Sequence, residues 1–149
     1  MAGTDVRIAM IAAQWHSDLV NVATTACHSH LVAAGIAEDA ISLITVPGSL
    51  ELPLVAKVLA TSGDYDAVLA FGCVIKGETE HFRLVADGAA QGLMRVALDT
   101  GVPVLNGVLA AYDASQAESR SGGEHGNTGS QTALAAIRMA RAARAAGVK

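Results

Sequence analysis

Short apolar runs alternate along this chain with longer stretches whose apolar residues repeat at helical spacing. The short runs are rich in Val, Ile, Leu and Ala and end at Gly, Pro or polar residues, which is typical of buried β-strands. They predict four strands, at Arg7–Ala12, Ile41–Val46, Ala67–Gly72 and Val102–Leu105, the last extending as far as Leu109.

The stretches between these runs predict helices. Two of them stop directly before a glycine, Gly35 or Gly101, which is the preferred residue just after a helix. Five helices are expected, at Asp18–Ala34, Leu50–Ala60, His81–Thr100, Ser115–Arg120 and Gly129–Ala146. Nearly continuous apolar strands separated by helices indicate a parallel sheet that is covered on both faces. The predicted fold class is therefore α/β, a three-layer α/β/α sandwich around a central four-stranded parallel sheet.

Composition narrows this picture. A length of 149 residues without a linker-like segment fits one domain, residues 1–149, and with 3% aromatic residues its interior must consist of small aliphatic side chains. The net charge of −4 with scattered Lys and Arg argues against a nucleic-acid partner. Neither a signal peptide nor an 18-residue apolar segment is present, so we expect a cytoplasmic protein without a membrane partner. Cys27 and Cys73 are isolated and lack metal-ligand spacing, so neither a disulfide nor a metal is expected.

Most unusual residues of the chain follow a predicted strand. In a parallel sheet, ligands bind beyond the carboxyl ends of the strands, so these residues should meet at one edge. They are Gln14, Trp15 and His16 after the first strand, Pro47–Glu51 after the second, Cys73–His81 after the third and Asn106 after the fourth. Core packing alone would not collect the only Trp, a Pro-Gly turn and Asn106 there. Trp15 suits stacking on a flat heterocycle, although it could also cap the core.

The segment Gly72–Val85, GCVIKGETEHFRLV, carries the candidate chemistry. It delivers loop amides, the Thr79 hydroxyl and the His81 imidazole to the start of a helix, where anions bind. A cation is disfavoured at a helix start, which favours a functional reading of His81, whereas a carboxylate such as Glu51 is favoured there on structural grounds alone. We interpret this segment as an anion-binding and proton-transfer site.

Two further features, a Gly-rich segment and a pair of histidines, suggest a nucleotide site and a metal site, but only weakly. The Gly-rich segment Ser119–Gly129 precedes a helix, but it does not follow a strand and matches neither phosphate-loop pattern. It is better interpreted as a loop that presents Arg120 as a fork for an anion. His28 and His30 are two positions apart on a predicted helix and cannot share a face, so they do not indicate a metal site.

Five motifs resemble, in order and spacing, those of the lumazine synthase family of riboflavin biosynthesis. They are VPGSLELP at Val46–Pro53, GCVIKGETEHF at Gly72–Phe82, NGVL at Asn106–Leu109, QAESR at Gln116–Arg120 and GNTG at Gly126–Gly129. The resemblance covers nearly the whole chain and implies a flavodoxin-like sheet. It also implies a cofactor-free condensation of 5-amino-6-ribitylamino-uracil with 3,4-dihydroxy-2-butanone 4-phosphate. The products are 6,7-dimethyl-8-ribityllumazine, phosphate and water.

The resemblance assigns roles to residues in both halves of the expected site. Trp15 takes the position that stacks on the pyrimidine. The ribityl chain is held by Ser49, Leu50 and Glu51, and the ring edge is met by Cys73, Val74, Ile75 and Asn106. The phosphate is bound by Gly77, Glu78, Thr79 and Arg120, and protons are moved by His81.

One pair departs from the family pattern. Thr128 and Gln131 stand where the family usually carries a Lys and an acid, leaving two neutral groups that border the site and can still hydrogen-bond, with Thr128 kept as a substrate-binding candidate. The resemblance further implies a homo-pentamer with sites between neighbours. It leaves open a 60-subunit icosahedral shell and suggests riboflavin synthase as a partner.

Two alternatives belong to other functional classes. One is a non-catalytic relative that binds a lumazine or flavin or only builds a shell. The change at Thr128 and Gln131 favours it slightly, whereas the intact His81, Arg120 and Gly77–Thr79 loop disfavour it. The other is a flavodoxin-like electron carrier, which the same sheet could support. An electron carrier of that kind would need a hydroxyl-rich loop after the first strand, and Gln14-Trp15-His16 is not one.

Overall fold

A four-stranded, all-parallel sheet forms the centre of the protein in a computed structural model that describes residues 5–77, 81–123 and 126–147. The strand order is β2-β1-β3-β4. The strands are β1 (Ile8–Ala13), β2 (Ile41–Val46), β3 (Ala67–Ile75) and β4 (Val104–Ala111). The predicted parallel sheet is confirmed.

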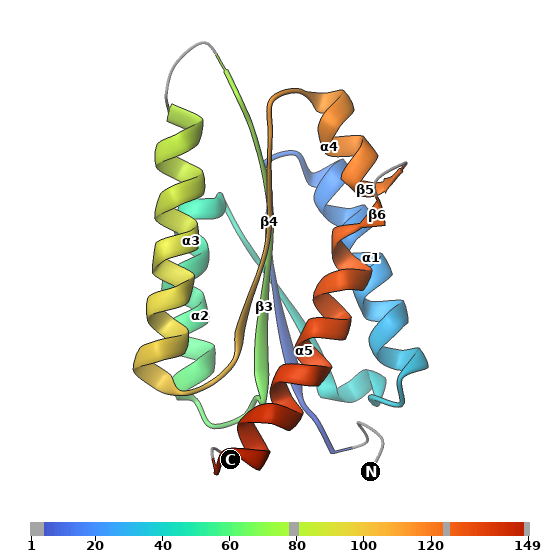
Figure 1. Ribbon diagram of the computed structural model, residues 1–149, viewed down its shortest axis with the longest axis vertical. Helices are drawn as coiled ribbons and strands as arrows, with labels where there is room; N and C mark the ends of the chain where they lie inside the picture. Colours follow the sequence, from blue (N-terminus) through green and yellow to red (C-terminus); the bar gives the residue numbers. More distant parts are fainter. Residues whose placement is uncertain (1–4, 78–80, 124–125, 148–149) are drawn as a thin grey trace.

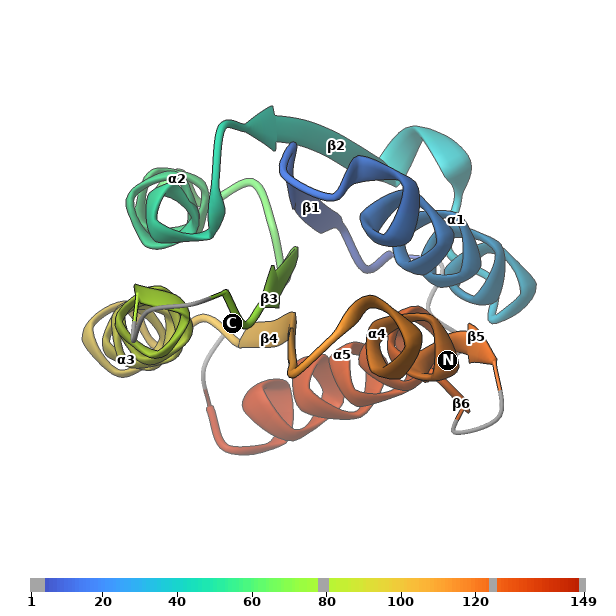
Figure 2. The same cartoon turned by 90° about the horizontal axis from the view of Figure 1, so that it is seen from above.

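Helices cover both faces of the sheet, which confirms the three-layer α/β/α sandwich (Figures 1 and 2). On one face lie α1 (Ser17–Ala33) and α5 (Thr128–Ala145), and on the other α2 (Leu52–Thr61) and α3 (His81–Thr100). Short elements connect these layers: the 3-10 turns η1 (Glu38–Ala40) and η2 (Ser49–Glu51), the helix α4 (Ala114–Arg120), and a hairpin of β5 (Ser121–Gly123) and β6 (Gly126–Asn127).

The alternation of side chains along buried strands produces two separate cores. In β1 all six residues are buried, with Ile8, Met10 and Ala12 facing one layer of helices and the residues between them facing the other. The first core joins this strand to α1 and α5 and includes Leu31 and Phe71. The second joins it to α2 and α3. Small aliphatic side chains dominate both cores, as the composition predicted.

Two predicted strand limits are wrong. The third strand does not end at Gly72 but continues to Ile75, and β4 runs beside it from Val104 to Ala111. A strand-interior glycine is tolerated here because the Ser49 hydroxyl of η2 occupies the space that a Gly72 Cβ would need. Asn106 consequently lies in the first half of β4, paired with Ala70, and not at a carboxyl end.

The layer of α1 and α5 has an unusually close helix crossing. A Cβ placed on Gly129 would collide with the backbone carbonyl of Ala23, so the two helix backbones touch at this point. Asn127 caps the same end of α5, where its side-chain oxygen accepts a hydrogen bond from the Ser130 N–H at 3.1 Å. The start of α5 is therefore firmly fixed against α1.

The opposite end of α5 joins the two ends of the chain. The Arg144 guanidinium lies 3.2 Å from carboxylate oxygens of both Asp5 and Asp66, and Asp66 also accepts a hydrogen bond from the Arg7 N–H. Asp5 and the end of α5 therefore lie together at the amino-terminal edge of the sheet (Figure 1). Among the helices in the described ranges, none is long and apolar enough to cross a membrane.

Candidate functional site

A cavity of about 400 Å³ opens at the carboxyl ends of β1, β2 and β3. Four segments line it: the turn after β1, the η2 turn, the end of β3 and the first turns of α3. Their lining residues are Trp15, His16, Gly48, Ser49, Leu50, Glu51, Cys73, Val74, Ile75, Gly77, His81, Phe82 and Val85. Most of the residues predicted after the first three strands therefore line one cavity, although Gln14, Pro47 and Lys76 do not, and residues 78–80 lie outside the described part of the chain.

Trp15 and Glu51 approach each other over the bare backbone of Gly48. A Cβ on Gly48 would lie 3.0 Å from Glu51 Oε1 and 3.2 Å from Trp15 Cδ1, closer than side chains normally pack. The Trp15 side chain is 71% exposed, so it does not cap the core. Its indole is available as a platform for a flat ring, with a carboxylate beside it that can accept hydrogen bonds.

The floor of the cavity is the end of β3. Cys73 and Val74 are buried and Ile75 is partly buried, while Ser49 packs against the glycine that precedes them. Burial, with a smaller contribution from the Asp18 carboxylate, raises the pKa of the Cys73 thiol to about 11. Cys73 is therefore a neutral thiol at physiological pH and cannot act as a nucleophile there.

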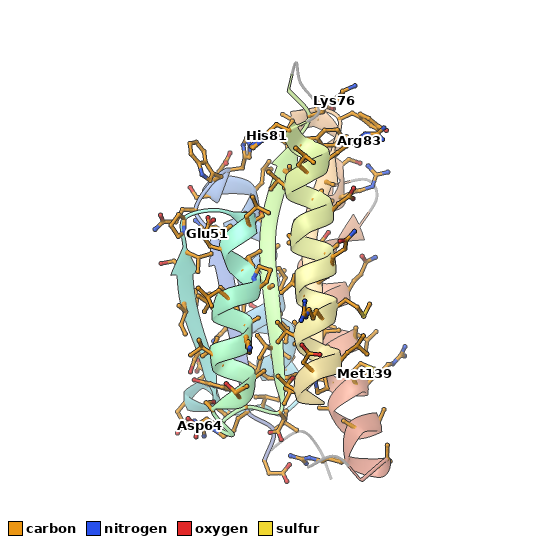
Figure 3. The ribbon with its side chains drawn as sticks, turned by 90° about the vertical axis from the view of Figure 1, so that its left-hand side faces the viewer. Glu51, Asp64, Lys76, His81, Arg83 and Met139 are labelled. Atoms are coloured by element: carbon orange, nitrogen blue, oxygen red, sulfur yellow. The ribbon has the colours of Figure 1, made fainter. Side chains whose placement is uncertain are left out.

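Helix α3 forms another wall of the cavity. His81, Phe82 and Val85 lie on its first two turns and point toward the cavity side, and Figure 3 shows His81 and Glu51 on neighbouring elements near the same end of the molecule. Leu50 reaches toward α3, where its Cδ2 is 2.8 Å from the position of a Cβ on Gly88. Beside this wall the Phe82 and Tyr112 rings are 6.0 Å apart, and Lys76 Nζ is 5.6 Å from the Tyr112 ring centroid.

Three predicted site residues do not line this cavity. Arg120 is the exposed last residue of α4, and no ion pair joins it to another described residue. Asn106 and Thr128 line a second hollow of about 250 Å³ between β4 and α5, together with Gln131. The Thr128 hydroxyl donates a hydrogen bond to the Arg120 carbonyl oxygen at 3.2 Å. Glu78 and Thr79 lie outside the described residues.

Phe82 and Val85 line the cavity although no site role was predicted for them, and His16 and Gly48 were predicted only to lie at this edge of the sheet. His16 is in the left-handed conformation, with φ 57°, at the N-cap of α1, where its carbonyl accepts hydrogen bonds from Leu19 and Val20. Helical spacing could have found Val85, which lies one turn after His81 on the same face of α3, whereas Phe82 is adjacent to His81 and is not placed on that face by spacing. In the described part of the chain no three His, Cys, Asp or Glu side chains cluster closely enough to hold a metal ion.

Comparison with known proteins agrees with this arrangement. Residues 5–144 match the family model described as 6,7-dimethyl-8-ribityllumazine synthase. The chain is 48% identical over 136 residues to the 6,7-dimethyl-8-ribityllumazine synthase of Xanthomonas euvesicatoria, covering 91% of this chain and 88% of that protein. It is 50% identical over 133 residues to the protein of the same name from Stenotrophomonas maltophilia, covering 89% and 86%. The chain therefore belongs to the 6,7-dimethyl-8-ribityllumazine synthase family.

Proposed function

We propose that this protein condenses 5-amino-6-ribitylamino-uracil with 3,4-dihydroxy-2-butanone 4-phosphate to form 6,7-dimethyl-8-ribityllumazine. The cavity is the observation that carries this proposal. In a chain of this family it brings together the exposed indole of Trp15, the carboxylate of Glu51 and the imidazole of His81 at the carboxyl edge of the sheet. Its volume of about 400 Å³ falls in the range that small-molecule sites occupy.

The pyrimidine substrate fits the side of the cavity that Trp15 borders. The indole stacks on the heterocycle, and the Cys73–Ile75 backbone faces the ring edge. Ser49, Leu50 and Glu51 hold the ribityl chain, since a polyol needs hydrogen-bond acceptors and donors in a row. Placing both substrates in one cavity supplies much of the rate by proximity.

The proton transfers fall to His81. The amine attacks the ketone and expels water as an imine forms, phosphate then leaves by elimination, and ring closure expels a second water. Each step needs a proton taken up or given, and imidazole is the side chain that does both near neutral pH. Gly77, Glu78 and Thr79 bind the phosphate as it leaves, and Arg120 stabilises its charge.

Arg120 and Asn106 complete the site from a neighbouring copy of the chain. Neither lines the cavity of its own chain, so a single copy does not bring all the predicted residues together. Exposed apolar side chains on α2 and α3 support assembly: Leu54, Val58, Leu84, Met94 and Leu98 are each 60% to 77% exposed. A monomer would leave this surface in water. We propose a homo-pentamer as the assembly.

Fluorescence of the lumazine product tests the activity. The purified protein should form product faster than the uncatalysed mixture, and His81→Ala should lower kcat by about ten- to a hundred-fold without abolishing turnover. Arg120→Ala should raise the KM for the keto-phosphate by about ten-fold or more, because a charge-assisted contact is lost. Arg141→Ala, an exposed arginine remote from both hollows, is the matched control and should leave both constants unchanged.

Mixed assemblies test the shared site. In the proposed site His81 comes from one copy and Arg120 from its neighbour. Refolding the His81→Ala and Arg120→Ala variants together should therefore produce some sites in which both residues are intact. Activity above the sum of the two separate variants is expected. No recovery in co-assembled particles, verified by light scattering, would contradict a site between copies and leave the reaction itself untouched.

A further inference from the structure

Thr128 makes a contact that bears on Arg120. It is the first residue of α5, and its Oγ1 lies 3.2 Å from the backbone carbonyl oxygen of Arg120, eight positions earlier. This hydrogen bond spans the base of the β5–β6 hairpin, so it ties the end of α4 to the start of α5.

The chemistry of the hydroxyl decides what Thr128 can do in this arrangement. A threonine hydroxyl has one proton, and here the Arg120 carbonyl accepts it. Toward any ligand the same oxygen can then only accept. A phosphate group offers acceptor oxygens and needs donors, so Thr128 in this geometry is a poor direct ligand for it.

The two ends of this hydrogen bond differ in rigidity. The start of α5 is fixed by the Asn127 cap and by the backbone contact between Gly129 and Ala23. Arg120, in contrast, ends a seven-residue helix, which is too short to be stable by itself. The start of α4 is held by Asp113, which accepts from the Gln116 N–H at 2.8 Å, and by Gln116, which accepts from the Tyr112 N–H at 2.8 Å. Thr128 supplies a side-chain contact at the other end.

We propose that Thr128 is a positioning residue, whose hydroxyl holds the Arg120 backbone so that the guanidinium is aimed at the substrate phosphate. The proposal rests on the proposed function, in which Arg120 binds that phosphate. Thr128 acts on the reaction only through Arg120, and its removal affects the keto-phosphate and not the pyrimidine substrate.

A double-mutant cycle tests this proposal by steady-state kinetics. Thr128→Val removes the hydroxyl but keeps the β-branched shape, and Thr128→Ser keeps the hydroxyl. Ser130→Ala is the matched control, since the Asn127 cap uses the Ser130 backbone N–H and not its side chain. Far-UV circular dichroism and urea midpoints establish that each variant is folded before KM and kcat are measured.

Thr128→Val should raise the KM for the keto-phosphate about three- to ten-fold, the effect of one lost neutral hydrogen bond, with kcat within about two-fold. Thr128→Ser should restore the KM. In the Arg120→Ala background, Thr128→Val should change the KM by less than about two-fold, because the residue it acts through is absent.

Three results would overturn the proposal. An unchanged KM in Thr128→Val, with Arg120→Ala still impaired, removes the positioning role and leaves the proposed function intact. The same fold-change in both backgrounds assigns Thr128 a contact of its own with substrate. No product above background, or an Arg120→Ala variant with normal KM, removes the phosphate role of Arg120 and the positioning role that depends on it.

Discussion

Gly48 shows how a missing side chain shapes the cavity. Its bare backbone lets Trp15 and Glu51 come together on one wall. The backbone there is extended, with φ −144°, so alanine would be tolerated conformationally and only its Cβ would disturb the wall.

Gly48→Ala should therefore raise the KM for the pyrimidine substrate several-fold, because the indole and the carboxylate must move apart to accommodate a methyl group at 3.0 to 3.2 Å. The KM for the keto-phosphate serves as the internal control and should change much less. Equal effects on both substrates would indicate a general distortion instead of a displaced wall.

The two thiols give a pH-dependent prediction. Burial raises the pKa of Cys27 to about 12 and that of Cys73 to about 11, from ordinary values near 9. Only the thiolate reacts with iodoacetamide, so at pH 8 Cys73 should be alkylated about a hundred-fold more slowly than a free thiol, and Cys27 more slowly still. Both rates should become normal in urea. Rapid labelling of folded Cys73 would contradict its burial.

The raised pKa values of the two thiols also make the stability of the protein depend on pH above about 9. There the unfolded chain loses thiol protons that the folded chain retains, so the unfolded state binds fewer protons and the free energy of unfolding falls as pH rises toward 11. Replacing Cys27 with Ala should reduce this alkaline slope, which urea titrations at pH 8.5 and 10.5 would measure.

The sequence predicted the position of some site residues and not of others. Trp15, Ser49, Glu51 and His81 follow strands or begin helices, and chain order alone places such positions at the carboxyl edge of a parallel sheet. Arg120 could not be placed this way, because it ends the short helix α4 and does not follow a strand of the sheet. Phe82 and Val85 were hidden because apolar residues at helical spacing are usually core.

At the scale of elements, the order and the layers were predictable and the strand lengths were not. Helix α3 begins and ends as predicted, since a charged start and Gly101 mark its limits. β3 extends past Gly72 for a tertiary reason, the pairing of Cys73–Ile75 with Leu109–Ala111 of β4, which no local pattern reveals. Because β4 continues to Ala111, Asn106 lies in the first half of this edge strand and away from the cavity.

Two helical glycines give opposite predictions for the same substitution. Gly129→Ala should lower the free energy of unfolding by about 2 kcal/mol or more, because the new methyl group collides with the Ala23 backbone, which cannot move without separating α1 from α5. Gly88→Ala meets only the Leu50 Cδ2 at 2.8 Å, the far end of a flexible side chain. Since alanine favours helix by about 1 kcal/mol, Gly88→Ala should be neutral or stabilising.

Urea unfolding followed by circular dichroism compares the two variants directly. Similar midpoints for both would show that the α1–α5 crossing adapts to a methyl group, contrary to the close backbone contact.

At the scale of the whole molecule, Arg144 connects residues that are distant in sequence. It joins Asp5 near the start of the chain, Asp66 before β3 and its own helix α5, and these contacts raise the pKa of its guanidinium. Since Asp66 also accepts from the Arg7 N–H, the four groups form a network and not an isolated pair.

Arg144→Ala should lower the free energy of unfolding by about 1 kcal/mol, near the upper limit for partly exposed ion pairs. Arg95→Ala is the control, because Arg95 forms an exposed pair with Asp99 one helical turn away, for which about 0.3 to 0.5 kcal/mol is expected. The Arg144 effect should shrink in 1 M NaCl, where charge interactions are screened. Equal losses in both variants would show that the network adds nothing to a single surface pair.

The joined chain ends have a consequence for engineering. Asp5 and Arg144 are in contact at the amino-terminal edge of the sheet, and the cavity opens at the opposite edge. A short peptide could bridge the old ends, and new ends could be cut in the exposed turn at Ser62–Asp64, giving a circular permutant with the same three layers. A cargo fused before Asp5 or after Arg144 would leave the chain on the side away from the cavity.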